Sequence, residues 1–168
     1  MIPIISFIGR HNSGKTTVLT GVIQHLTSAG YKVAVIKHAL HGLNIAAHKD
    51  SEMFLQAGAD FVLANSPSLC IQYRRQAKEP NFELLLRDLP EDVDLIIVEG
   101  YKKEALPKIE VLRSEIDPEP MLLPQTLALV SDFTLPADLP VFDRNAIKDI
   151  ADFILQVLNI TAANWPNN

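Results

Sequence analysis

Cysteine is almost absent from this 168-residue sequence, which contains only Cys70. A single cysteine cannot form a disulfide within the chain, so the fold must be held together by its core. Cys70 lies in an apolar, strand-like run, and we therefore expect it to be a core residue. A chain without disulfides is typical of a reducing compartment.

Long apolar runs and a basic charge excess are also missing. No stretch approaches the roughly 18 apolar residues of a membrane span, and the first residues show neither a basic leader nor a small-residue cleavage site. We therefore expect a cytoplasmic protein with no membrane partner. Lysine and arginine total 15 against 20 acidic residues, a net charge of −5. This balance predicts no broad basic face for nucleic acid.

The most informative stretch follows an apolar run at 2–8. Gly9 is followed at fixed spacing by Gly14-Lys15-Thr16, which is the phosphate-binding pattern G-x-x-x-x-G-K-[ST]. Glycines let the backbone wrap so that its N–H groups converge on phosphate oxygens, and the following helix adds its free N-terminal N–H groups. The alternative is a glycine turn that matches by chance, but a strand precedes the motif and a helix follows it. We predict a nucleoside triphosphate site formed by Gly9, Arg10, His11, Asn12, Ser13, Gly14, Lys15, Thr16 and Thr17.

Two side chains of this loop have expected roles, and a third comes from a distant strand. Lys15 can reach the β- and γ-phosphates, and the Thr16 hydroxyl can ligate Mg²⁺. Glu99 ends a run of buried-type apolar residues, where a carboxylate can hold Mg²⁺ or its water. We predict Thr16 and Glu99 as metal residues. The alternative for Glu99 is an exposed acid in the turn before Gly100.

The remaining pattern alternates strands with helices, so the fold class is α/β. We predict a P-loop NTPase-like, mostly parallel sheet with flanking helices and a small antiparallel hairpin extension. One nucleotide-binding domain is expected over residues 1–160, with a frayed tail at 161–168. The predicted strands are 2–8, 32–37, 60–65, 68–73, 94–99, 109–112 and 126–130. The predicted helices begin after Gly14 and at Asp50, Asn81 and Asn145.

Lys37 and His38 end the second strand at the edge where the nucleotide is expected. They are read either as contacts to phosphate or to a second ligand, or as a solvated strand end. His41 and His48 follow in a loop, and with His38 they raise the question of a metal site. No cysteine and no helical spacing supports a structural zinc ion there.

Two expected features of a GTPase are missing. The Asn-Lys-x-Asp motif that reads guanine in many GTPases does not occur, so the sequence does not name the base. No motif places a glutamine or an arginine to orient water or to act as a finger, so fast hydrolysis is not indicated and no catalytic residue is assigned.

An ordered set of motifs extends over nearly the whole chain: GRHNSGKTT, VIKH, KDS followed by AGA, LIIVEGYK and LVSD. The set resembles the molybdopterin-guanine dinucleotide biosynthesis adaptor family, MobB. The resemblance implies a GTP-binding adaptor with at most weak, Mg²⁺-dependent GTPase activity. It also implies a homodimer that assists the molybdenum cofactor guanylyltransferase, and molybdopterin or its nucleotide form as a further partner.

Carried over by position, the resemblance makes Gly14, Lys15, Thr16 and Thr17 phosphate and Mg²⁺ residues. It makes Lys37, His38, Asp50 and Lys102 candidates for a second ligand, beside Glu99. Where the family commonly has acidic residues after Lys-His, this chain has Asn44 and Ala46. The dimer is expected to use strand edges of the 60–73 hairpin or of the 109–112 strand.

Two other functions remain open. A small-molecule kinase would use the same loop with ATP or GTP, and such kinases generally have an arginine-rich lid. The only adjacent arginines are Arg74 and Arg75, in the predicted hairpin. A pure interaction module would hold the nucleotide as a structural ligand.

Overall fold

A computed structural model describes residues 2–39, 42, 49–116 and 118–160. The chain divides into two compact units, one containing Met1–His38 and Leu89–Asn168 and the other Ala39–Asp88. The second unit is thus an insertion in the sequence of the first. The expectation of one nucleotide-binding domain over 1–160 stays a prediction, and the tail at 161–168 lies outside the described residues.

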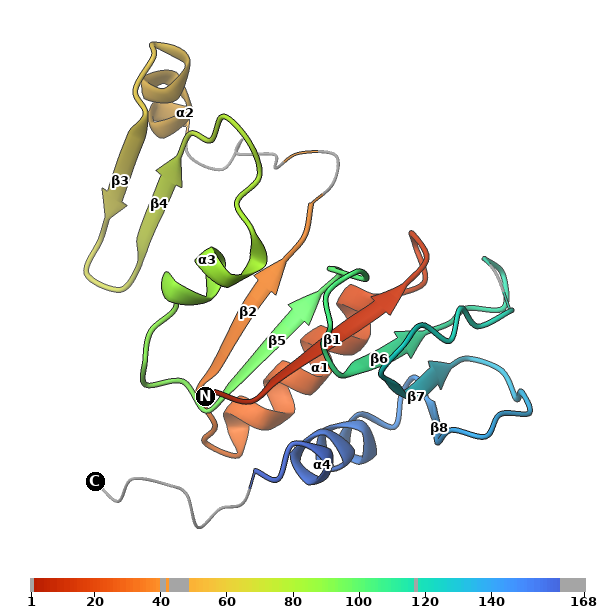
Figure 1. Ribbon diagram of the computed structural model, residues 1–168. Coiled ribbons are helices and arrows are strands. Elements are labelled where there is room, and N and C mark those ends of the chain that lie inside the picture. The colour runs from red at the N-terminus through yellow and green to blue at the C-terminus, as the bar shows by residue number, and fades with distance from the viewer. Residues whose placement is uncertain (1, 40–41, 43–48, 117, 161–168) are drawn as a thin grey trace. The chain divides into compact units, whose positions relative to one another are not determined.

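The first unit is built on a parallel sheet of six strands in the order β2-β5-β1-β6-β7-β8 (Figure 1). Every pairing between neighbouring strands of this sheet is parallel. The carboxyl ends of all six strands therefore lie at one edge. The strands are β1 (Ile4–Gly9), β2 (Val33–Lys37), β5 (Leu95–Glu99), β6 (Lys108–Val111), β7 (Thr126–Ser131) and β8 (Val141–Asp143).

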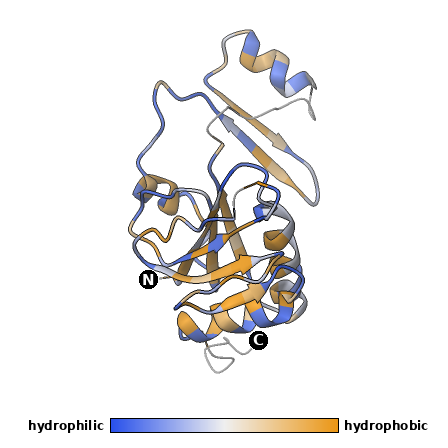
Figure 2. Cartoon of the chain, turned by 90° about the vertical axis from the view of Figure 1, so that its right-hand side faces the viewer, coloured by the Kyte–Doolittle hydropathy of each residue, from blue (hydrophilic) through white to orange (hydrophobic). Residues whose placement is uncertain are grey.

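One face of this sheet is covered by α1 (Lys15–Ser28) and α4 (Ile147–Val157), which lie side by side (Figure 1). Alternate strand residues, such as Ile5 and Phe7, are fully buried in one cluster with Val22 and Ile154 of the helices. Alternation arises because successive strand side chains point to opposite faces of a sheet. In Figure 2 the hydrophobic colouring accordingly extends along the strands and helices of this layer.

The opposite face of β6 is buried as well, but it carries charge. Lys108 and Glu110 are both almost completely inaccessible. The Lys108 ammonium donates to the carbonyls of Glu104, Leu106 and Pro124, at 2.7, 2.9 and 3.2 Å. The Glu110 carboxylate accepts the backbone N–H groups of Met121 and Leu122, at 2.8 and 3.0 Å. These two side chains therefore fix the loops on either side of β6 in sequence, and sequence inspection did not single them out.

The second unit contains the predicted antiparallel hairpin. Strand β3 (Phe61–Asn65) pairs with β4 (Cys70–Arg74), and these two form a separate sheet. The unit also contains α2 (Lys49–Gln56) and α3 (Phe82–Arg87). The Asn81 side chain accepts the N–H of Leu84, so the predicted cap of α3 is confirmed. The predicted fold class is confirmed in both sheets.

Three details of the prediction were wrong. Cys70 is exposed rather than a core residue, because it lies on the hairpin face opposite Ile71 and Tyr73, which are partly buried. The strand predicted at 109–112 is no edge, since β6 lies between β1 and β7. Asn145 does not cap α4: the cap residue is Ala146, because the Asn145 N–H donates to the Asp143 side chain and the helix starts later. In addition, β8 was not predicted.

Among the described residues, no helix is both long and apolar enough to cross a membrane.

Candidate nucleotide-binding site

The predicted phosphate-binding loop connects the carboxyl end of β1 to the first turn of α1. Gly9 has a φ of +154°, and a Cβ built on it would lie 2.4 Å from the Val111 carbonyl oxygen. A side chain at this position would therefore displace backbone of β6. Asn12 and Gly14 also have positive φ values, 61° and 87°. Where residues with positive φ alternate with residues of ordinary φ, successive backbone N–H groups point to one side and form a concave anion-binding site.

The first turn of α1 has no internal partner for its amide groups. The cap residue Gly14 has no side chain to accept them, and the described structure gives α1 no other side-chain cap. Ser13 Oγ is buried without a hydrogen-bond partner beside Gly9. Buried polar groups of this kind are rare in native proteins. The loop therefore has unsatisfied donors where the motif places a phosphate.

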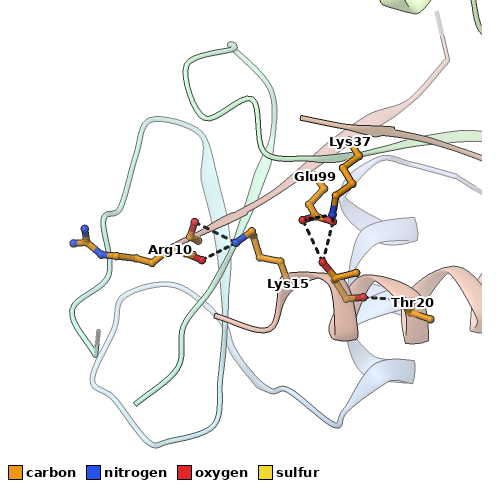
Figure 3. A network of polar contacts seen from close by, with 7 residues as sticks. Arg10, Lys15, Thr20, Lys37 and Glu99 are labelled. Atoms are coloured by element: carbon orange, nitrogen blue, oxygen red, sulfur yellow. Dashed lines mark hydrogen bonds and ion pairs between the residues drawn. The ribbon is translucent and has the colours of Figure 1, made fainter. Parts of the chain in front are cut away.

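Lys15 lies across this loop. Its ammonium donates to the Arg10 carbonyl at 2.7 Å and to the Gly9 carbonyl at 3.4 Å (Figure 3). Burial lowers the pKa of Lys15 below its usual value, the nearby Glu99 carboxylate opposes this shift, and the Lys102 and Lys37 ammonium groups add to it. Backbone carbonyls thus hold the Lys15 ammonium, and the oxygen of a bound phosphate can replace them as its acceptor.

Thr16 meets Glu99 on the other side of the loop, and Figure 3 shows the Lys37 ammonium at the same carboxylate. Strand register explains the meeting: Glu99 pairs with Phe7 of β1 on one side and with Lys37 of β2 on the other. The Thr16 hydroxyl donates to both Glu99 carboxylate oxygens at 3.2 Å. The Lys37 ammonium lies 3.0 and 2.9 Å from the same oxygens. The structure therefore brings together the two residues predicted as metal ligands.

His38 and Lys102 were predicted as contacts to a second ligand. His38 stacks on Tyr101, with ring centroids 4.4 Å apart, and a Cβ on Gly100 would approach the His38 Cβ within 3.0 Å. Lys102 is exposed next to the Met121 sulfur, at 3.7 Å.

Other described residues that were predicted for the site lie apart from the cluster of Thr16, Glu99 and Lys37. Arg10 and His11 are exposed, and the Arg10 guanidinium points away from Lys15 in Figure 3. Asp50 lies in α2 of the second unit. His41, His48, Asn44 and Ala46 lie outside the described residues.

Arg144 is a neighbour of the loop that sequence reasoning missed. Its guanidinium lies so close to the loop that a Cβ on Gly14 would be 2.7 Å from one of its terminal nitrogens. The other terminal nitrogen is 3.7 Å from the Asp132 carboxylate, which also accepts the Ser114 N–H at 2.8 Å. No spacing in the sequence links residue 144 to residue 14. The contact exists because β8 ends at the same sheet edge as β1.

Comparison with known proteins shows the family of this chain. Residues 4–132 match the family described as molybdopterin guanine dinucleotide synthesis protein B, MobB. The chain belongs to this family. The molybdopterin-guanine dinucleotide biosynthesis adapter protein of Haemophilus influenzae is 34% identical over 91% of this chain and 88% of its own length. The Escherichia coli protein of the same name is 30% identical over 93% of each chain.

Solved MobB structures have the same fold. A crystal structure of molybdopterin-guanine biosynthesis protein B superposes with a TM-score of 0.74 at 31% identity, over 92% of this chain and 99% of that one. The structure of Bacillus subtilis MobB gives a TM-score of 0.73 over 95% and 100%, and at 22% identity this likeness supports the fold alone. The resemblance drawn from the ordered motifs is thereby confirmed.

Proposed function

We propose that this chain binds GTP with Mg²⁺ at the loop 9–17 and acts as an adaptor in molybdopterin guanine dinucleotide synthesis. The observation that carries the proposal is the meeting of Thr16 with Glu99 beside the loop, next to Lys15. Backbone N–H groups and Lys15 would take the phosphates, and the oxygen pair would take the ion. GTP rather than ATP rests on the family, because no residue motif names the base.

The donor set suits Mg²⁺. Thr16 and Glu99 offer oxygen ligands, which this hard cation prefers, and Mg²⁺ usually keeps several waters beside one or two protein ligands and the substrate phosphates. Within the described residues there is no group of three histidine, cysteine or acidic side chains that could hold a metal alone. A site completed by phosphate oxygens fits this arrangement. When bound, the ion would neutralise charge on the phosphates.

The adaptor role follows from the relatives, whose name describes an adapter protein of molybdopterin-guanine dinucleotide biosynthesis. We infer that this chain assists the guanylyltransferase that joins GMP to molybdopterin, with slow GTP hydrolysis at most. Molybdopterin or its nucleotide form is the second ligand in this proposal. Lys37, His38, Asp50 and Lys102 are its candidate contacts.

Lys15→Ala tests nucleotide binding. Calorimetric titration of GTP and ATP, each with Mg²⁺, should show strong loss of triphosphate binding in the variant, because a charge-assisted contact worth about 1.5–3 kcal/mol is removed. Lys32→Ala is the matched control: it removes the same charge just before the amino end of β2, away from the loop, where Lys32 pairs with Asp92 at 2.8 Å. Equal GTP affinity in Lys15→Ala and wild type would contradict the proposal.

A homodimer is part of the proposed function. Among the described residues, β3 and β4 pair only with each other, so each strand has an unpaired edge there, and Phe61 and Leu63 are exposed on one face of this sheet. Unpaired strand edges and exposed apolar side chains are features that a second copy can cover. Light scattering at micromolar concentration should give twice the monomer mass, and Leu63→Arg should reduce it. A monomeric wild type would refute this part of the proposal.

The contacts of Arg74 and Arg75 do not support the alternative function as a kinase. Arg74 lies 3.6 Å from the Asp88 carboxylate, and Arg75 donates to the Leu55 carbonyl. Both guanidinium groups thus contact other residues of the second unit.

A further inference from the structure

The Glu99 carboxylate is shared between two donors. The Lys37 ammonium lies 3.0 and 2.9 Å from its two oxygens, and the Thr16 hydroxyl donates to the same oxygens at 3.2 Å (Figure 3). In the proposed complex, Thr16 and Glu99 face Mg²⁺ or its bound water. The ion and the Lys37 ammonium would then share one carboxylate. Because two cations at such separations repel each other, the proposed metal site competes with the Lys37–Glu99 ion pair.

The Lys37 ammonium can change its partner at little cost. Its side chain is 51% exposed, whereas that of Glu99 is only 14% exposed. A lysine side chain is a flexible four-carbon stem with three rotatable donors, and an exposed ion pair contributes little to stability. The backbone of Glu99 is fixed on both sides, because it pairs with Phe7 of β1 and with Lys37 of β2. Of the two charged side chains, Lys37 is therefore the one free to move.

The positive charge around Glu99 exceeds what one carboxylate can neutralise. Burial is the main cause of the lowered pKa of Lys15, and the Lys102 and Lys37 ammonium groups lower it further, against the opposing effect of Glu99. Lys15 is the side chain that reaches the β- and γ-phosphate oxygens in loops of this kind. The charge of Lys37 therefore acts on the position where the last phosphate of a triphosphate is expected. A diphosphate lacks this phosphate and offers Lys37 no such partner.

We propose that Lys37 distinguishes a nucleoside triphosphate from a diphosphate, because its ammonium leaves Glu99 for the γ-phosphate when Mg²⁺ and a triphosphate bind. With a diphosphate, Lys37 stays at Glu99 and competes with the ion. The step is an exchange of ion-pair partners in which no covalent bond changes. The inference rests on the proposed nucleotide binding by the loop, and it assigns Lys37 to the nucleotide rather than to the second ligand.

The ratio of the GTP affinity to the GDP affinity tests this role, because effects common to both nucleotides cancel. Both affinities are measured with Mg²⁺ by calorimetry for wild type, Lys37→Met and Lys37→Arg. Methionine keeps an unbranched side chain but removes the charge. We expect Lys37→Met to lower the ratio by about 10- to 100-fold, the range for a lost hydrogen bond to a charged group. Lys37→Arg keeps the charge and should retain part of the preference for GTP.

Lys32→Ala serves again as the charge-matched control and should leave the ratio unchanged. Retained GDP binding in Lys37→Met also shows that this variant is folded. An unchanged ratio in Lys37→Met, including an equal loss of both nucleotides, would overturn the inference. A ratio that falls as far in Lys37→Arg as in Lys37→Met would overturn it as well, because the charge would then not be the cause.

Wild-type protein that binds GDP as tightly as GTP would overturn the role of Lys37 and leave the loop's function intact. Wild-type protein that binds neither nucleotide would instead refute the proposed nucleotide binding itself.

Discussion

Glu99→Gln is the sharpest test of the metal assignment. Glutamine keeps the shape and volume of the side chain but removes the charge that favours Mg²⁺. Triphosphate should still dock on the backbone N–H groups and on Lys15, neither of which needs this carboxylate. The expected change is therefore a weaker effect of Mg²⁺ on GTP binding rather than a loss of binding.

The structure gives the size of this effect. The Glu99 side chain is only 14% exposed, and its carboxylate lies 3.2 Å from the hydroxyl that would ligate the ion. Opposite charges at such separations interact by several kcal/mol at an effective dielectric constant of about 20. Ligand and solvent rearrangement reduce the net effect. Mutation of a residue that supports a metal through its ligands or its bound water typically costs about 10- to 100-fold in metal affinity, or about 1.4–2.8 kcal/mol, and we expect a loss of this order.

Stability should change little in this variant. Glu99 also pairs with Lys37, whose side chain is 51% exposed, and exposed ion pairs contribute about 0–1 kcal/mol. If Glu99 were only an acid in a turn, this small stability change would be the whole effect.

The assay is a double-mutant-type cycle. GTP affinity is measured with Mg²⁺ and with a chelator, in wild type and Glu99→Gln, and the ratio of the two Mg²⁺ effects gives the coupling. Asp94→Asn is the control, since it removes the same charge just before the other end of β5, where the Asp94 carboxylate accepts the Lys32 N–H at 2.8 Å. A coupling factor near one for Glu99→Gln would refute the metal role.

Two further predictions concern buried charge. Burial lowers the pKa of Lys15 from 10.5, so GTP affinity should fall as the pH rises through that lowered pKa, at a lower pH than for an ordinary lysine. The free protein should gain stability over the same pH range, because the unfolded chain binds more protons there than the folded chain. Calorimetry across this alkaline range checks the first part, and an affinity that stays constant up to about pH 10 would contradict it. Glu110→Gln replaces one of two buried acceptors with a donor, so urea unfolding should show a loss of about 1–3 kcal/mol, and wild-type stability would contradict the role of Glu110 in fixing Met121 and Leu122.

Local sequence patterns were sufficient to predict much of the fold and the part of the site formed by the loop and Glu99. The glycine and lysine spacing of the loop, the apolar run before Glu99 and the hairpin at 60–73 are all encoded within short stretches. Strand periodicity and turn residues act over such distances, so these features could be read without a structure. The placement of Glu99 beside Thr16 was also anticipated, because parallel strands end at one edge of the sheet.

Strand order could not be read in this way. The 109–112 segment has the same apolar pattern at an edge or in the interior, and only its pairing with both β1 and β7 shows that it is interior. Cys70 likewise lies in an apolar run, yet its face of the hairpin is exposed. Burial depends on what covers each face, and that information is not local.

The sequence by itself determined the phosphate-binding loop, its lysine and threonine, and the carboxylate opposite them, because each depends on residue type at short spacing. Only the tertiary structure decided which strands flank the loop and which distant side chains reach it. Arg144 lies 130 positions from Gly14 in the sequence but touches it, because β8 ends at the same edge as β1. Contacts of this kind are set by sheet topology, which no short stretch of sequence contains.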